Sequence, residues 1–403
     1  MKTVVIGSGI VGMFSAYYLT EKGRKVTILE KEEGPAGASI GNAGMIVPSH
    51  FTPLAAPGVM GQALKWMLKP DSPFALHPTM DMNFLRWGLK FIGASRKKDL
   101  AEKSKFLYEL NLESRKLYEE FIQKEKIEVG FQPRGLIMLC KTEKGLNHEK
   151  ILAEQSWELG MKADILTKQE AEKLNGGLEL DILGGVYYPN DAFLTPGLLL
   201  SNLEIILKNR GVEFIKNIKK IQFSSENNEI TSLQADEHTI NDANEYVIAA
   251  GMGSVSLAKS LGVSLPMISG KGYSVTMKDV TPRPEICGIL TEARVAYTPM
   301  VNGVRFGGTM ELGGKLDRVN KKRLSGIFKS IPRYFPDYKN LAFEQEEVWS
   351  GLRPCTPDGL PIIGRLAPYK NAYLNTGHAM MGLSLGPVSG KRLAGMVGTS
   401  TKS

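Results

Sequence analysis

Three glycines near the N-terminus restrict the fold of this chain more than any other feature. The run Gly7-Ser8-Gly9-Ile10-Val11-Gly12 follows an apolar, β-branched segment at 3–6 and precedes an apolar segment with helical character at 13–19. In a strand–turn–helix unit, the first glycine permits the tight turn, the second lets the backbone approach a pyrophosphate, and the third lets the helix pack closely on the strand. The N-terminus of the helix then offers N–H groups and a positive dipole end to phosphates. The motif therefore predicts a parallel sheet that binds a dinucleotide.

An acidic residue supports this interpretation. A second predicted strand at 25–29 ends at Glu30, at about the distance after the glycines where a carboxylate accepts hydrogen bonds from ribose hydroxyls. Such an acid disfavours a 2′-phosphate, which argues against NADP. The alternative is a glycine-rich turn that binds no ligand, and the motif alone does not distinguish NAD from FAD.

Two later segments favour a flavin. The segment 37–46 is a loop of small residues, which lets backbone N–H groups and short side chains line the edge of a flat ring system. The segment 244–251 is a strand that ends in small residues, and it resembles the second flavoprotein fingerprint, in which a strand runs back under the nucleotide. Taken alone, this second segment is equally compatible with an ordinary strand followed by a turn.

Composition excludes several other classes of protein. Of the 403 residues, 42% are hydrophobic and 23% are charged, which is typical of globular proteins and not of disordered, collagen-like or disulfide-rich chains. The net charge of +8 is spread thinly and is compatible with anionic small molecules, with an acidic membrane surface or with no particular partner. Three cysteines without CxxC spacing and five scattered histidines predict a reducing compartment without disulfides or a metal site. Because neither a signal peptide nor a long apolar window is visible, we expect a cytoplasmic location.

The chain resembles the FAD-dependent amine and amino-acid oxidoreductases of the D-amino-acid oxidase type, and among them most resembles bacterial D-amino-acid dehydrogenases. The matching stretches follow the family's order across nearly the whole chain: 4–31, 39–44, 55–58 with 63–67, 270–274, 351–354 with 356–359, and 375–378. The chain departs from the dehydrogenases of D-alanine at Ile40-Gly41, where they usually carry Phe-Ala, and at 297–300. The exact substrate therefore stays open, and a cyclic imino acid such as a D-proline derivative is included.

The resemblance implies an α/β fold with two domains. One is a Rossmann-like FAD-binding domain, which we expect to consist of 1–90, 185–260 and 345–403. The other is an inserted α+β substrate domain with an antiparallel sheet that roofs the flavin, which we expect to consist of 91–184 and 261–344.

The resemblance also implies which residues hold FAD, without a covalent bond. Cys355 does not match the attachment site of covalent flavins and is interpreted as a buried thiol. The turn before the final helix is expected to present N–H groups, with His378 at the same edge, to the flavin O2 carbonyl, where they stabilise negative charge on reduction. The predicted cofactor-binding residues are Gly7, Ser8, Gly9, Ile10, Val11, Gly12, Glu30, Lys31, Ala38, Ser39, Asn42, Ala43, Gly44, Met45, Ile218, Ala250, Gly251, His378, Met381, Gly382, Leu383 and Ser384.

Four residues are candidates for substrate binding. By the resemblance, Arg353 binds the substrate carboxylate, because a planar guanidinium matches two carboxylate oxygens. Tyr273 is expected to add a hydrogen bond to the same carboxylate, with a core tyrosine as the alternative. His50 and Tyr297 are further candidates for the pocket wall. No catalytic base is expected, since hydride transfer from a neutral amine needs none.

The implied function is FAD-dependent oxidative deamination of a D-amino acid or cyclic D-imino acid, with a hydride moving from the α-carbon to flavin N5 and electrons passing to a quinone or another carrier. An oxygen-using oxidase of the glycine or sarcosine type, a tRNA-modification protein and a nucleotide-binding regulator without turnover are the alternatives. The dispersed charge does not predict nucleic-acid binding. A peripheral contact with the inner face of a membrane stays open. The basic cluster Lys315, Arg318, Lys321, Lys322 and Arg323 is interpreted as a solvated helix face, with a membrane-surface patch as the alternative.

Overall fold

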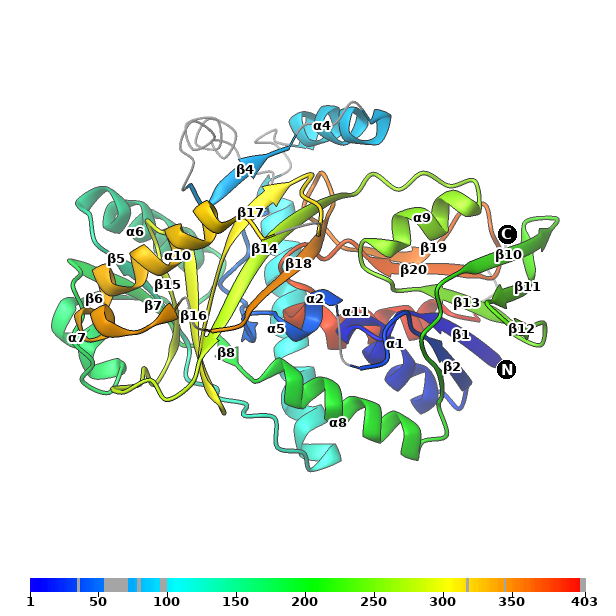
Figure 1. Ribbon diagram of the computed structural model, residues 1–403, viewed down its shortest axis with the longest axis horizontal. Coiled ribbons are helices and arrows are strands. Elements are labelled where there is room, and N and C mark those ends of the chain that lie inside the picture. Colours follow the sequence, from blue (N-terminus) through cyan, green and yellow to red (C-terminus); the bar gives the residue numbers. More distant parts are fainter. Residues whose placement is uncertain are drawn as a thin grey trace.

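The computed structural model describes residues 1–34, 37–53, 72–77, 81–94, 100–316, 319–343 and 346–398. Two sheets lie side by side along the long axis of the molecule (Figure 1). The predicted motif stretches 55–58 and 63–67, together with Arg318, lie outside the described residues. No helix within the described ranges is long and apolar enough to cross a bilayer.

The first sheet contains the glycine-rich unit. Five of its strands are parallel, and β19 forms an antiparallel edge next to β20. In spatial order the strands are β19 (Ile362–Arg365), β20 (Ala372–Thr376), β13 (Glu245–Ile248), β1 (Lys2–Ile6), β2 (Lys25–Leu29) and β9 (Glu213–Ile215). β1 is buried on both faces, as its β-branched run predicts. The expected α/β class is confirmed.

Different layers cover the two faces of this sheet. The face with Val5 and Val247 packs against helices, and the face with Val4 and Tyr246 packs against a small antiparallel sheet and one helix. The helices of the first face are α1 (Ile10–Glu21), α5 (Leu100–Glu125), α8 (Pro196–Asn209) and α11 (Gly382–Met396). The opposite layer consists of α9 (Gly253–Ser260), β10 (Ile221–Glu226), β11 (Glu229–Ala235) and β12 (His238–Ile240).

The second sheet is larger and mostly antiparallel. It places β18 (Val348–Cys355) at one edge, followed by β14 (Ile268–Met277), β17 (Gly303–Leu312), β16 (Val295–Met300), β15 (Cys287–Leu290), β5 (Leu136–Cys140), β7 (Gly184–Tyr188) and β6 (Asp164–Thr167), while β4 (Phe74–Leu76) pairs with β17. The associated helices are α6 (Glu143–Glu158), α7 (Lys168–Leu174), α10 (Lys321–Tyr334) and the 3₁₀ helix η2 (Pro336–Asn340). α10 packs on the face with Tyr273 and Phe306.

Three short elements and one longer helix complete the described fold. α2 (Gly37–Ile40) follows the glycine-rich unit, and β3 (Met45–Ile46) pairs with β8 (Ala192–Phe193). α4 (Met82–Ala94) lies outside both sheets, at the top of Figure 1.

Several strands belong to a different sheet from the one that the expected domain limits imply. β4, β7 and β18 fall largely or wholly within the segments assigned to the FAD-binding domain, yet they pair in the second sheet. Conversely, α5 was assigned to the substrate domain, but its Tyr118 and Phe121 pack on Phe14 of α1. A local pattern identifies a strand or a helix but not its non-local partner, which explains the difference. The two-domain division itself stays a prediction.

Candidate active site

The glycine-rich loop is packed as its motif predicts. A Cβ added to Gly12 would lie 1.9 Å from the carbonyl oxygen of Gly7, and a Cβ added to Gly7 would lie 2.7 Å from that of Ala249. Glycine is therefore needed for α1 to approach β1 and for the loop to approach the end of β13. A Cβ on Gly9 would meet only Ser39 Oγ, at 3.3 Å. Gly9 is also the N-cap of α1, and its position has no side-chain cap.

The carboxylate of Glu30 lies on this loop. Its Oε2 accepts hydrogen bonds from the N–H of Ser8 at 2.6 Å and from Ser8 Oγ at 2.7 Å. Its Oε1 accepts from the N–H of Lys31 at 2.6 Å and of Glu32 at 3.1 Å. The N–H of Ile218 donates to the Glu30 carbonyl at 2.9 Å. The structure thus brings Glu30, Lys31 and Ile218 together beside the loop, with the side chain of Lys31 exposed and that of Ile218 buried.

The segment 37–45, which begins with α2, lies against the start of α1. Ser39 Oγ accepts a hydrogen bond from the N–H of Ile10 at 3.1 Å and so replaces the missing cap. Asn42 Oδ1 accepts from the N–H of Gly44 at 2.8 Å. Gly44 has φ +78°, and a Cβ there would lie 2.2 Å from the carbonyl oxygen of Leu194. Predicted residues Ala38, Ala43 and Met45 belong to this same segment, while Ala250 and Gly251 follow β13.

The turn before α11 contains the expected N–H groups, but one predicted cofactor-binding side chain, that of Ser384, already has partners within the protein. Met381 is the N-cap of α11 without a side-chain cap, so the first-turn N–H groups around Gly382 and Leu383 remain available to a ligand. The Ser384 hydroxyl, however, accepts from the N–H of Val47 and donates to Asn111. The His378 ring is buried and hydrogen-bonded through Nε2 to Ser389 Oγ at 2.9 Å. Burial lowers the pKa of His378 to about 3, so its imidazole is neutral.

Arg353 lies on β18, where the register places it opposite Gly270 of β14. Its guanidinium covers Gly272, because a Cβ added there would lie 2.2 Å from Nη1. Nη1 donates a hydrogen bond to the carbonyl of Thr309 at 2.9 Å. Burial lowers the pKa of Arg353. Among the described residues, no carboxylate lies within ion-pair distance of this guanidinium.

Thr309 belongs to a β-bulge that sequence reasoning missed. The pairing of β17 with β14 is irregular between Lys271 and Tyr273, and Thr309 in the facing strand has φ +64°. A bulge re-aims backbone groups, and here it turns the Thr309 carbonyl toward Arg353. The Thr309 hydroxyl is buried and has no partner within the described part of the chain. The adjacent pair Gly307-Gly308 was the available signal, since glycine inside a strand often marks a bulge.

The face of the second sheet that carries Arg353 is turned toward the segment 37–45. Ser274 Oγ donates to the carbonyl of Gly41 at 3.0 Å. Arg305 Nη1 donates to the carbonyls of Ile40 and Asn42, each at 2.8 Å. Burial lowers the pKa of Arg305 to about 10. Arg305 therefore joins the second sheet to the segment 37–45 next to the candidate site, a role the sequence did not reveal.

Tyr273 and Tyr297 lie on the opposite face from Arg353, which differs from the expectation. Side chains alternate between faces along a strand, so Tyr273 projects away from the side on which Gly272 supports Arg353. Tyr297 is fully buried and packs edge-on against Phe335, at 5.1 Å between ring centroids. Both tyrosines belong to the apolar core beneath α10.

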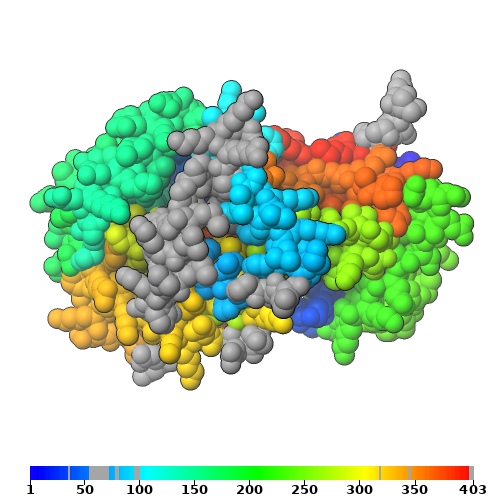
Figure 2. Space-filling view, turned by 90° about the horizontal axis from the view of Figure 1, so that it is seen from above, coloured from blue at the N-terminus to red at the C-terminus, as the bar shows by residue number. Residues whose placement is uncertain are grey.

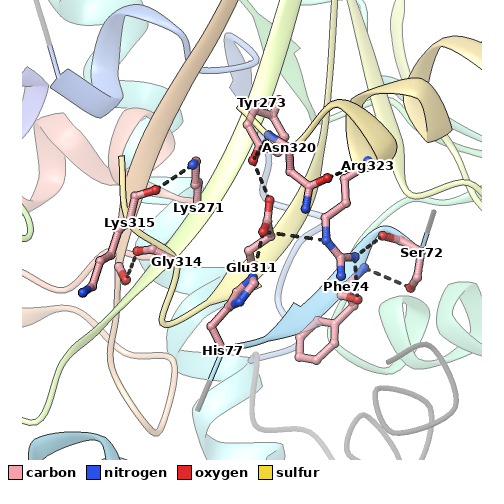
Figure 3. Close-up of polar contacts among 11 residues, drawn as sticks. Ser72, Phe74, His77, Lys271, Tyr273, Glu311, Gly314, Lys315, Asn320 and Arg323 are labelled. Carbon is pink, nitrogen blue, oxygen red and sulfur yellow. Dashed lines mark hydrogen bonds and ion pairs between the residues drawn. The ribbon is translucent and has the colours of Figure 1, made fainter. Parts of the chain in front are cut away.

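The hydroxyl of Tyr273 belongs to a buried polar cluster around Glu311 (Figure 3). It donates to Glu311 Oε1 at 2.6 Å and accepts from the N–H of Asn320 at 3.1 Å. Oε2 of Glu311 lies 2.8 Å from His77 Nε2 and 3.7 Å from Arg323 Nε. The cluster fastens β4 and the start of α10 to β17. It also corrects the interpretation of the basic run at one position, because the side chain of Arg323 is only 11% exposed, while Lys315, Lys321 and Lys322 are exposed.

His50 belongs to another polar group. Its Nδ1 lies 3.2 Å from Ser49 Oγ, which donates to Asp191. Burial, together with the charge of Arg294, lowers the pKa of His50 to about 4. Burial raises the pKa of Asp191 to about 7. Within the described ranges, no hydrogen bond joins His50 to Arg353, and a role of His50 in the pocket wall stays a prediction.

These residues fit FAD. The glycine turn at the start of α1 and the carboxylate of Glu30 beside it form a cradle for a pyrophosphate and a ribose. The Arg353 face of the second sheet meets the segment that follows this cradle. A dinucleotide-binding sheet next to a second, mostly antiparallel sheet is the arrangement expected of a flavin-dependent oxidoreductase.

The comparisons with known proteins agree with this class. The family described as FAD dependent oxidoreductase matches residues 2–396, and the chain belongs to it. A D-amino acid dehydrogenase of Granulibacter bethesdensis is 32% identical, over 98% of this chain and 96% of its own length. The solved glycine oxidase from Bacillus cereus ATCC 14579 has a TM-score of 0.75 at 21% identity, over 98% of this chain and 93% of that one. For an L-alpha-glycerophosphate oxidase from Mycoplasma pneumoniae with FAD bound, the TM-score is 0.74 at 17% identity, over 99% and 95% of the two chains. The protein is thus an FAD-dependent enzyme.

Proposed function

We propose that this enzyme oxidises a D-amino acid, or a cyclic D-imino acid such as a D-proline derivative, and passes the electrons to a quinone or another carrier. Similarity over nearly the full length to a protein named D-amino acid dehydrogenase supports this substrate class. FAD, held without a covalent bond, supplies the hydride acceptor N5 for the hydrogen on the α-carbon. Cys355 is fully buried, with its Sγ directed at the carbonyl of Arg353, which supports the non-covalent assignment.

The observation that carries the proposal is the state of Arg353. A guanidinium that is largely buried and left without an anion is unfavourable, and within the described ranges the acceptor of Arg353 is a backbone carbonyl. A substrate carboxylate would supply two charge-assisted hydrogen bonds in the planar geometry that arginine prefers. Arg353 is partly exposed, so a ligand can reach it. A carboxylate-bearing amine is the substrate class that such an arginine beside a flavin serves best.

The remaining residues of the site would position the substrate-binding arginine and stabilise the negative charge that develops on reduction. The Thr309 carbonyl fixes one nitrogen of Arg353 and leaves the other donors for the substrate. The first-turn N–H groups of α11 would stabilise negative charge where it develops on reduction. No residue of this group is assigned as a base, because a substrate amine that binds neutral loses its hydride without one.

Anaerobic flavin bleaching tests the substrate class. The purified enzyme is expected to be yellow and to release its FAD into the supernatant on acid precipitation. A panel of D-amino acids and D-proline derivatives should bleach the flavin band without oxygen, and the L-enantiomers should not. Failure of every D-substrate would overturn the proposal. Peroxide formed stoichiometrically under air would instead support an oxygen-using oxidase of the glycine or sarcosine type.

A further inference from the structure

One large aromatic side chain, that of Trp349, shares the face of the second sheet with Arg353. The two residues are four positions apart on β18, so both point to the same side of the strand. Val348, the residue before Trp349, packs against the core beneath α10, which places the indole on the opposite face. Trp349 is only partly buried. The indole is therefore a side chain of the candidate site that so far has no role.

The indole of Trp349 and the guanidinium of Arg353 lean toward one another. Cη2 of Trp349 lies 2.1 Å from the position of a Cβ added to Gly351, and Nη1 of Arg353 lies 2.2 Å from that of a Cβ added to Gly272. Gly272 and Gly351 are directly opposite each other in the register, and the Cβ positions of such a pair are about 4.5–5.5 Å apart. The edge of the indole and the guanidinium therefore lie side by side over two glycines.

The space on the other side of Arg353 is filled by the protein itself. A Cβ added to Gly270 would lie 2.5 Å from Met310 Sδ and 2.8 Å from Cys355 Sγ. Both side chains belong to an apolar cluster under α4, and α4, light blue in Figure 2, lies at the molecular surface. A ligand whose carboxylate binds Arg353 therefore extends toward Trp349 and not toward α4.

Small residues form the sheet surface next to Trp349. Across the strands, the register continues from Trp349 to Ser274, Gly307 and Ala296. On its other side the indole touches the segment 37–45, because a Cβ added to Gly41 would lie 1.9 Å from Cδ2 of Trp349. An aromatic wall above a floor of small residues fits an apolar or flat group that buries its surface against the ring.

We propose that the indole of Trp349 forms the wall of the substrate pocket beside Arg353 and packs on the side chain or ring of the substrate. This inference rests on the proposed function, since it takes the binding of a carboxylate to Arg353 as given. An acid held by Arg353 has the groups on its α-carbon within reach of the indole, and apolar groups gain by leaving water there. Trp349 thus favours amino or imino acids with an apolar side chain or a ring over glycine and over acids with a charged side chain.

Two unreactive carboxylates test the inference on the FAD-loaded enzyme without turnover. Acetate offers only a carboxylate, whereas pyrrole-2-carboxylate adds a flat ring, and the change in flavin absorbance measures the dissociation constant of each. Trp349→Ala should weaken the binding of pyrrole-2-carboxylate by about tenfold or more and change that of acetate by less than about twofold, because acetate has no ring to pack on the indole. Trp349→Phe keeps an aromatic ring and should fall in between. Arg353→Ala should weaken the binding of both.

Gly41→Ala tests the same inference through the position of the indole. Its new Cβ would displace the ring, and Gly41 has no positive φ, so alanine is compatible with the backbone. We expect the same selective loss of pyrrole-2-carboxylate binding. Trp157 on α6, which is 48% exposed, provides the matched control, and Trp157→Ala should bind both carboxylates like the wild type. Flavin content and thermal midpoint identify any variant that folds poorly, and Trp349→Phe then carries the test.

The outcomes separate this inference from the proposed function. If acetate binds and the ratio of the two dissociation constants is the same in Trp349→Ala as in the wild type, the role of Trp349 is overturned and the role of Arg353 stands. A loss of FAD affinity in Trp349→Ala with an unchanged ratio would also overturn it, since the indole would then contact the cofactor. If neither carboxylate binds the wild type, or if Arg353→Ala changes neither constant, the proposed function fails together with this inference.

Discussion

The Nη1 of Arg353 donates a hydrogen bond to the carbonyl oxygen of Thr309, 2.9 Å away on a different strand. The bulge in β17 presents this carbonyl, and Gly272 on β14 leaves room for the guanidinium. Three strands therefore determine where one functional group lies. Such a position is rigid, as a site that orients a small substrate requires.

Two substitutions of Arg353 should separate the contribution of its positive charge from that of its planar guanidinium geometry. We expect Arg353→Ala to lower kcat/KM for carboxylate-bearing substrates by about 100-fold or more, because a charge-assisted pair shielded from water is lost. Arg353→Lys keeps the charge without the planar fork and should fall in between. Steady-state kinetics and flavin content measure the effect, and flavin content should stay unchanged in both variants.

A substrate without a carboxylate is the control for this prediction. Turnover of a simple cyclic amine should be poor in the wild type and insensitive to Arg353→Ala, since this amine does not use the arginine. Equal losses for both kinds of substrate would contradict the assignment of Arg353.

Gly272 should affect the same kinetics indirectly. A Cβ at Gly272 would come within 2.2 Å of Arg353 Nη1, so Gly272→Ala must displace the guanidinium. We expect a fall in kcat/KM of about tenfold or more for acid substrates, with little effect on the cyclic amine. Gly307→Ala, on the same face, would make only an ordinary 3.5 Å contact with Ser274 and should be close to wild type. Similar kinetics for the two alanine variants would argue against displacement of Arg353.

Glu30 should matter for binding the cofactor and not for turnover. Glu30→Ala removes an acceptor for the ribose and is expected to weaken FAD binding by about 1–3 kcal/mol. Flavin titration of the apoprotein measures this, and Glu32→Ala removes a neighbouring exposed carboxylate as the control. At saturating FAD, a large fall in kcat for Glu30→Ala would show that Glu30 has a different role.

The buried carboxyl of Asp191 predicts a pH dependence of stability. Burial raises the pKa of Asp191 from 3.8 to about 7, so between these values the folded protein binds more protons than the unfolded one. Stability should therefore fall as pH rises through this window, on the order of 1 kcal/mol per pH unit from this group. Asp191→Asn keeps an acceptor for the N–H of Ser49 and should flatten the dependence. Urea unfolding of both proteins at pH 4.5 and 7 would test it, and parallel pH profiles would contradict the assignment.

The dinucleotide-binding unit was predictable because its determinants are local. The glycines at 7, 9 and 12, the apolar strand and the acid at 30 specify one turn and its immediate packing, and the structure places them as the motif requires. The antiparallel sheet that the resemblance implies for the inserted domain is also present, in β14 to β17 within the segment 261–344. The family resemblance added Arg353, whose sequence context alone is compatible with an ordinary ion pair.

The faces and partners of these strands depended on contacts between residues far apart in the chain. Tyr273 and Gly272 are neighbours in sequence, yet only Gly272 lies on the side of Arg353, because successive side chains point to opposite faces of a sheet. Arg305 reaches Ile40 and Asn42 only because the second sheet packs against the segment 37–45, and α5 joins the first core through Tyr118 and Phe121. A sequence pattern records the period of an element but not its pairing partner or register, and a shift of one residue exchanges the two faces.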